Sequence, residues 1–115
     1  TGEAKITRGY NLPAKYVIHT VGPIWNGGNY NEAELLASCY HNSLKLAVDN
    51  KIKTIAFPAI STGVYRFPLE RATEIAITEA KKFLEKNESI EKIIFFLFDD
   101  AVLNVYKKIF RDMRI

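Results

Sequence analysis

The sequence predicts a single domain of the α/β class, with three layers and a largely parallel sheet. After about residue 30, segments with helical spacing alternate with short apolar segments, as expected of helices that connect parallel strands. Residues 93–98 are apolar at every position, which is typical of a parallel strand covered on both faces. The 115 residues suffice for one domain with its own core, spanning residues 1–115.

Two short strands and a turn are expected first. Residues 5–8 alternate between polar and apolar side chains, and residues 9–13 indicate a turn because Pro13 restricts the residue before it to extended backbone. Residues 15–21 are rich in β-branched and aromatic side chains and stop at Gly22, which predicts a strand. The glycine-rich, polar residues 25–30 predict a loop.

The first helix is expected over about residues 32–49, where apolar side chains recur at helical spacing. Asn50 is its expected end. Asn31 and Glu34 resemble a capping box, with Asn in the place of Ser or Thr. The side chain of Asn31 is therefore predicted to cap the helix.

Two further pairs of strand and helix follow. Residues 54–57 predict a short buried strand, and Pro68 suits the first turn of the helix after it. Residues 91–98 predict the last strand. Asp99 or Asp100 is expected to cap the final helix.

The loop 58–68 is the main candidate binding site. Unpaired N–H groups in the first turn of the following helix, and the positive end of its dipole, favour an anion. Ser61, Thr62 and Gly63 have little bulk, so a phosphate can approach the main chain, while Tyr65 and Phe67 place aromatic surface beside it. The same residues also fit an ordinary turn between strand and helix, and both interpretations stay open at this point.

A second candidate region follows the last strand, because ligands of open α/β sheets bind outside the carboxyl ends of the strands. Phe98 offers a ring on which a base can stack, and the carboxylate of Asp99 or Asp100 can accept a hydrogen bond from an exocyclic amine. The alternative is that Phe98 belongs to the core and one aspartate is only a helix cap.

Charge and composition narrow the class of partner. The net charge of +3 comes from lysines scattered over several segments, without the basic stripe and interleaved aromatics of a nucleic-acid surface. A small anionic ligand therefore suits the chain better than nucleic acid. The single cysteine, Cys39, lies on the apolar side of the first helix and is predicted to be buried and inert. It fits a reducing, cytoplasmic environment, and no membrane partner is expected because no run of 18 apolar residues occurs.

Few residues suit catalysis. His19 lies in a predicted strand, where a hydrogen-bonded core histidine is the simpler interpretation, and His41 has no partner for acid–base chemistry. Ser61 is not surrounded by a G-x-S-x-G elbow, so covalent catalysis is not supported. No pair of His and Cys residues has metal-ligand spacing, and neither a metal nor a cofactor is expected.

Three stretches of the sequence together resemble the macrodomain family. They are residues 2–7 (Gly-Glu-Ala-Lys-Ile-Thr), 12–23 (Leu-Pro-Ala-Lys-Tyr-Val-Ile-His-Thr-Val-Gly-Pro) and 55–65 (Ile-Ala-Phe-Pro-Ala-Ile-Ser-Thr-Gly-Val-Tyr). The likeness covers essentially the whole chain. It is strongest to the branch whose members remove ADP-ribose from proteins or deacetylate O-acetyl-ADP-ribose, and it implies a three-layer α/β/α fold with a mixed sheet.

The resemblance also implies roles for the candidate residues. The loop would wrap the diphosphate of ADP-ribose through its backbone N–H groups, Tyr65 would pack against the distal ribose, and the region 98–100 would border the adenine. The ligand-binding residues implied are Ala59, Ser61, Thr62, Gly63, Val64, Tyr65, Arg66, Phe98, Asp99 and Asp100.

The sequence departs from the family pattern ahead of Thr1. Complete macrodomains carry there a strand ending in an Asn-Ala-Ala-Asn type motif, a glycine-rich loop and a helix, and the residues credited with catalysis lie on that segment. The strand would lie between those predicted at 16–21 and 54–57, so we expect an incomplete N-terminal part and a sheet split in two. A complementing segment or a second copy of the chain is expected to fill the gap.

The resemblance leaves more than one function open. The complete domain would bind ADP-ribose or an ADP-ribosylated protein and hydrolyse ADP-ribosyl esters, through catalytic residues expected upstream of Thr1. The alternatives are a module that binds ADP-ribose without cleaving it, or a scaffold fragment without activity.

Overall fold

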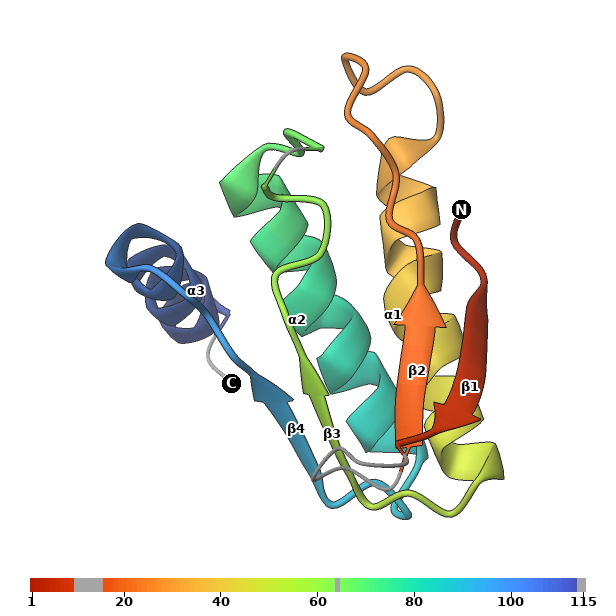
Figure 1. Ribbon diagram of the computed structural model, residues 1–115. Coiled ribbons are helices and arrows are strands. Elements are labelled where there is room, and N and C mark those ends of the chain that lie inside the picture. Colours follow the sequence, from red (N-terminus) through yellow and green to blue (C-terminus); the bar gives the residue numbers. More distant parts are fainter. Residues whose placement is uncertain (10–15, 64, 114–115) are drawn as a thin grey trace.

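A computed structural model of the chain describes residues 1–9, 16–63 and 65–113 (Figure 1). Strands and helices alternate from α1 onward, which confirms the α/β class. The elements in order are β1 (Ala4–Arg8), β2 (Tyr16–Thr20), α1 (Glu32–Asp49), β3 (Thr54–Phe57), α2 (Leu69–Lys86), β4 (Lys92–Phe95) and α3 (Asp100–Asp112).

The strands form two separate pairs. β1 runs antiparallel to β2, with Ile6 opposite Ile18, and β3 runs parallel to β4, with Ile55 opposite Ile93. Among the described residues no hydrogen-bonded ladder joins β2 to β3, so the sheet is split in two as the sequence analysis expects. A cleft of about 1570 Å³ lies between the two pairs, and its lining includes every residue of β2 and β3.

The core lies between the helices and one face of β3 and β4. The ring of Tyr40, on α1, meets Phe57 at 5.0 Å and Phe95 at 6.3 Å between centroids. Tyr106, on α3, meets Phe95 at 5.4 Å from the same side. These aromatic contacts tie β3 and β4 to two helices, while α2 packs between α1 and α3 (Figure 1).

The opposite face of β4 is less covered than its sequence predicts. Ile94 and Phe96 are each 42% exposed. The apolar run 93–98 predicts a strand buried on both faces, but the three described helices contribute their aromatic and aliphatic contacts to one face only. β4 also ends at Phe95 instead of Phe98.

The predicted caps of α1 and α3 have different outcomes. Asp99 caps α3 as predicted, because its carboxylate accepts a hydrogen bond from the Val102 N–H at 2.9 Å. The capping box at Asn31 is wrong: Asn31 has a left-handed backbone (φ 59°) and its side chain makes no capping hydrogen bond.

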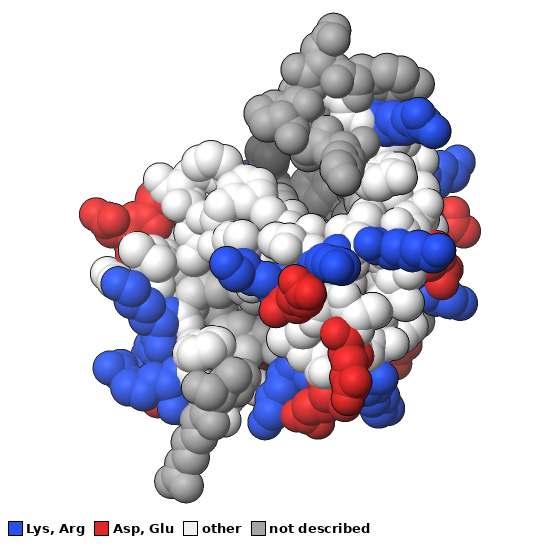
Figure 2. Space-filling view, turned by 90° about the horizontal axis from the view of Figure 1, so that it is seen from below, with Lys and Arg blue, Asp and Glu red and all other residues white. Residues whose placement is uncertain are grey.

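Charges of both signs are interspersed on the face at the amino ends of β3 and β4. Figure 2 shows lysines and arginines mixed there with aspartates and glutamates over much of the described surface. In the described part of the chain, no helix combines the length and apolarity needed to span a membrane.

Candidate functional site

β2, β3 and β4 all point the same way in Figure 1, so the loops that follow them gather at one edge of the molecule. That edge is where ligands of α/β proteins bind. The loop 58–68 follows β3, the loop 21–31 follows β2, and residues 96–99 follow β4.

The loop 58–68 is closed by its own backbone. The Phe67 N–H donates to the Ser61 carbonyl at 2.9 Å and the Arg66 N–H donates to the Gly63 carbonyl at 3.0 Å. Ser61 and Arg66 both have left-handed backbones, with φ of 66° and 60°. A left-handed backbone is unfavourable for residues other than glycine, so two such residues in one short loop indicate a conformation imposed by the surrounding structure. Strained backbone of this kind is often found at binding sites.

This closure leaves anion-binding groups available. Within the described residues, the N–H groups of Ser61, Thr62 and Gly63 donate to no acceptor, whereas the Thr62 hydroxyl is used inward, toward the Ala59 carbonyl at 3.0 Å. A β-carbon placed on Gly63 would meet no atom within 4 Å. Consecutive free N–H groups beside open space are the arrangement that binds phosphate oxygens. Val64, also predicted to bind ligand, lies outside the described residues.

The aromatic residues of the loop have two different roles. Tyr65 is 36% exposed, so its ring is accessible, and its role beside the ligand stays a prediction. Phe67 is only 2% exposed, so the prediction that it forms part of the ligand's aromatic wall is wrong. Its ring packs against Trp25 at 4.9 Å between centroids and belongs to the core.

Two residues that the sequence does not single out as site residues, Tyr40 and Gly22, support the loop. The hydroxyl of Tyr40 accepts a hydrogen bond from the Ile60 N–H at 3.4 Å. Gly22, directly after β2, lies so close to Ser61 that any β-carbon on it would overlap the Ser61 hydroxyl. The loops after β2 and β3 therefore pack directly against each other. Burial keeps the pKa of Tyr40 well above its ordinary value, so this hydroxyl stays neutral.

The loop after β2 is organised around a buried carboxylate. Glu32, at the start of α1, is only 2% exposed. It accepts hydrogen bonds from the N–H groups of Asn26, Gly28 and Tyr30 at 2.8, 2.9 and 2.6 Å. Desolvation alone would raise its pKa, but the backbone donors together lower the pKa from 4.5 to about 2. The carboxylate is therefore charged at neutral pH and orders the loop that precedes α1.

The buried Glu32 is expected to make stability depend on pH in the acid range. Because its pKa is lower in the folded than in the unfolded protein, its stabilisation is complete above about pH 4.5 and is lost as the pH falls toward about 2. Thermal unfolding followed by circular dichroism should show a steeper fall in melting temperature over this range for the parent than for Glu32→Gln. The two proteins differ only at residue 32, so parallel curves would contradict this role of Glu32.

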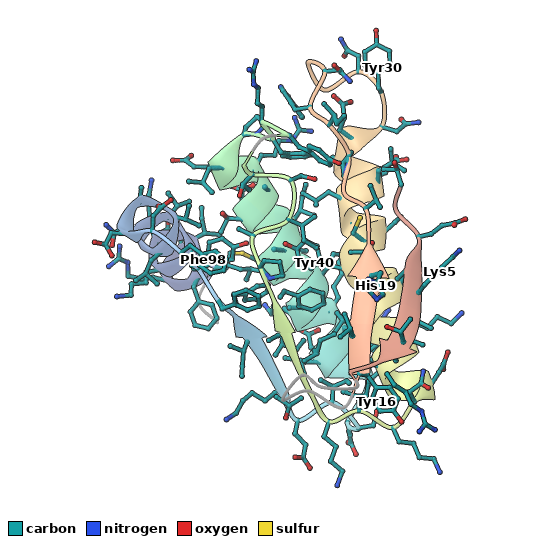
Figure 3. The ribbon with its side chains drawn as sticks, viewed as in Figure 1. Lys5, Tyr16, His19, Tyr30, Tyr40 and Phe98 are labelled. Carbon is teal, nitrogen blue, oxygen red and sulfur yellow. The ribbon has the colours of Figure 1, made fainter. Side chains whose placement is uncertain are left out.

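The region after β4 offers an exposed ring. Phe98 is 88% exposed, so the alternative that it belongs to the core is wrong. Figure 3 shows it between β4 and α3, and Phe96 supports its ring edge-to-face at 5.6 Å. Asp99 is used as the cap of α3, which is the simpler alternative for that residue. Asp100, the first residue of α3, is exposed.

The predicted site residues thus form two groups. Ala59, Ser61, Thr62, Gly63, Tyr65 and Arg66 lie together in one loop, and Phe98, Asp99 and Asp100 lie at the end of the neighbouring strand. The Phe96 N–H donates to the Phe57 carbonyl at 2.9 Å, which joins the starting points of the two regions.

The remaining candidates show no catalytic arrangement. His19 is exposed on β2, not buried, and its Nε2 lies 2.9 Å from the Thr7 hydroxyl (Figure 3). His41 packs on Phe83 at 5.9 Å between ring centroids. Cys39 is buried as predicted. Across the described ranges, no three His, Cys, Asp or Glu residues gather closely enough to hold a metal ion.

Several known sequences are similar to this chain. A family model for the macro domain matches residues 1–76. The macro domain-containing protein CT2219 of Chlorobaculum tepidum is 62% identical over 108 residues, covering 94% of this chain and 63% of that protein. The ADP-ribose glycohydrolase MACROD2 of Xenopus laevis is 54% identical over 110 residues, covering 94% of this chain and 26% of that protein.

Solved structures share the fold. The Oceanobacillus iheyensis macrodomain with ADP matches with a TM-score of 0.94 and 40% identity, covering 99% of this chain and 60% of that one. The Trypanosoma brucei macrodomain in complex with ADP-ribose matches with a TM-score of 0.86 and 41% identity, covering 94% and 45%. The chain thus spans less than two thirds of these relatives and carries their arrangement of strands and helices throughout. It belongs to the macro domain family.

Proposed function

We propose that this chain binds ADP-ribose, with the diphosphate held by the loop 58–68. The observation that carries the proposal is the set of N–H groups of Ser61, Thr62 and Gly63, which donate to no acceptor within the described residues, together with the open space beside Gly63. Relatives support the choice of ligand, since the Trypanosoma brucei macrodomain was solved in complex with ADP-ribose.

The two groups of residues also suggest where the distal ribose and the adenine of ADP-ribose bind. We propose that Tyr65 packs against the distal ribose and that adenine stacks on the exposed ring of Phe98. Asp100 is the better acceptor for the exocyclic amine, because the carboxylate of Asp99 already accepts the Val102 N–H. Isothermal titration calorimetry with ADP-ribose, ADP and ribose 5-phosphate tests this arrangement. Absence of heat with all three ligands would contradict it.

For the whole protein we propose hydrolysis of ADP-ribosyl esters, as in removal of ADP-ribose from proteins or deacetylation of O-acetyl-ADP-ribose. The support is the 54% identity to a protein named as an ADP-ribose glycohydrolase. A hydrolysis assay on an ADP-ribosylated protein tests this step. Binding without turnover by the full-length protein would instead favour a module that only reads ADP-ribose.

The cleft between β2 and β3 suits an additional strand. The carbonyls of Lys53 and Phe57 accept hydrogen bonds from residues of the β4 side. Because backbone groups alternate in direction along a strand, those of Thr54 and Ala56 point away from β4, toward the cleft. We propose that an extended segment pairs with this edge, as in β-strand addition.

Amide hydrogen exchange tests the strand proposal. The added polypeptide is the part of the Oceanobacillus iheyensis macrodomain that this chain does not match. The N–H groups of Thr54 and Ala56 should become protected when it is added. Ala56→Pro removes one cleft-facing donor, leaves the bonds to β4, and should prevent the protection. Protection without the polypeptide, together with a doubled mass by light scattering, would instead identify a second copy of the chain as the occupant.

A further inference from the structure

The buried carboxylate of Glu32 is connected to the diphosphate loop through a short series of contacts. The first is the hydrogen bond from the Gly28 N–H to Glu32 Oε2 at 2.9 Å. Gly28 has a left-handed backbone with φ of 91°, and a β-carbon on it would lie 2.9 Å from Cη2 of Trp25. Glu32 therefore holds a glycine whose backbone lies directly against the Trp25 indole.

Trp25 in turn holds two residues of the diphosphate loop. Its backbone N–H donates to the Tyr65 carbonyl at 2.8 Å, and its indole packs on Phe67 at 4.9 Å between ring centroids. The guanidinium carbon of Arg71, on α2, lies 5.9 Å from the indole centroid. The indole is thereby fixed between the loop after β2 and the start of α2.

A hydrogen bond within the loop connects Phe67 to the amides that are proposed to bind phosphate. The Phe67 N–H donates to the Ser61 carbonyl at 2.9 Å, so the position of Phe67 sets that of Ser61, which holds a left-handed backbone. The next residues, Thr62 and Gly63, carry N–H groups that donate to no acceptor in the described part of the chain. A shift of Trp25 would therefore move the donors that face the ligand.

We propose that Glu32 is a positioning residue for the diphosphate loop. Its carboxylate fixes Gly28 against Trp25, and Trp25 fixes Tyr65 and Phe67, so that the amides of the loop are oriented before a ligand arrives. The effect on ligand affinity rests on the proposed function, whereas the effect on the loop without ligand does not. Binding groups that are oriented in advance lose less entropy when the ligand binds.

The test compares Glu32→Gln with Glu34→Gln. Both residues lie in the first turn of α1, so the two substitutions remove the same charge from the same helix end. Glu34 is exposed, and no hydrogen bond joins it to the loop after β2 within the described residues. A glutamine at position 32 turns its amide nitrogen toward a backbone N–H, since the donors of Asn26, Gly28 and Tyr30 surround both carboxylate oxygens.

Fluorescence reports the loop directly because Trp25 is the single tryptophan of the chain. In Glu32→Gln without ligand, we expect the emission to shift to longer wavelength and quenching by acrylamide to increase, while Glu34→Gln behaves as the parent. Calorimetry should show about tenfold weaker ADP-ribose binding for Glu32→Gln, within the usual range for coupling between two sites. Unchanged emission or unchanged affinity in a folded Glu32→Gln would overturn the proposal.

A double-mutant cycle separates positioning from general destabilisation. Trp25→Ala should weaken ADP-ribose binding to the same degree, and Glu32→Gln combined with Trp25→Ala should bind no more weakly than Trp25→Ala alone. Additive losses would overturn the proposed connection. If Glu32→Gln does not fold, Gly28→Ala replaces it, because its methyl group displaces the indole while the carboxylate stays. Gly28→Ala binding as tightly as the parent would also overturn the connection.

Failure of the proposed function gives a different pattern. If the parent binds no ADP-ribose, exchange of the Phe67 amide still tests the positioning. This amide donates to Ser61, and it should exchange faster in Glu32→Gln than in Glu34→Gln. Equal exchange in the two variants would overturn the role of Glu32, independently of the ligand.

Discussion

Replacing Gly63 with valine is expected to abolish ADP-ribose binding while the fold is kept. A β-carbon at this position meets nothing within 4 Å, so the isopropyl group fills the space in which a phosphate would approach the N–H groups of Ser61, Thr62 and Gly63. A hydrogen bond to a charged group contributes about 1.5–3 kcal/mol. Losing two of them weakens binding at least about 100-fold, since each 1.4 kcal/mol corresponds to about a factor of ten.

Calorimetry and thermal unfolding measure the two halves of this prediction. Gly63 does not have a left-handed backbone, so valine is tolerated and the free energy of unfolding should change by about 0.5 kcal/mol or less. Gly63→Ala is the graded control, because a single methyl group should weaken binding less than valine does. If Gly63→Val bound ADP-ribose as tightly as the parent, the diphosphate would lie elsewhere.

Replacing Phe98 with alanine is expected to weaken ADP-ribose binding about 5- to 150-fold, since stacking of a base on an aromatic ring contributes about 1–3 kcal/mol. The ring is 88% exposed, so its removal should leave the free energy of unfolding nearly unchanged. The loss should apply only to ligands that carry a base. Ribose 5-phosphate should bind the variant and the parent alike.

Two further variants complete the test of Phe98. Phe98→Tyr keeps the ring and should bind ADP-ribose like the parent. Phe110→Ala removes a ring that is 47% exposed near the C-terminal end of α3, the opposite end of the helix from Asp100, and should leave the affinity unchanged. Equal losses for ADP-ribose and ribose 5-phosphate in Phe98→Ala would show that the ring acts on the loop and not on the base.

The elements that depend on local pattern agree with their predictions. The helices at Glu32–Asp49 and Leu69–Lys86 and the strands at Tyr16–Thr20 and Thr54–Phe57 lie where apolar spacing places them. The candidate loop occupies its expected place between β3 and α2. These features follow from side chains close together in sequence, which is why periodicity and turn residues suffice to locate them.

The errors concern residues whose surroundings come from distant parts of the chain. Phe67 looks like a ligand-facing ring by its place in the loop, but Trp25 lies beside it and buries it. Asn31 fits a capping pattern, but its side chain makes no capping hydrogen bond, and the neighbouring Glu32 instead binds three backbone N–H groups of the preceding loop. A buried, charged carboxylate with such partners is hard to predict from sequence, because its neighbours Gly27 and Gly28 indicate only a flexible loop.

By itself, the sequence determines the order of strands and helices, the place of a small-residue loop at a helix start, and the likeness to the macro domain family. The tertiary structure alone decides which N–H groups of that loop find no acceptor among the described residues, because the groups that support the loop belong to other elements. Tyr40 comes from α1, Gly22 and Trp25 follow β2, and their hydrogen bonds and contacts hold Ser61 in its left-handed conformation. A backbone donor is available to a ligand only when every nearer acceptor is already used, and that depends on packing across the whole edge of the sheet.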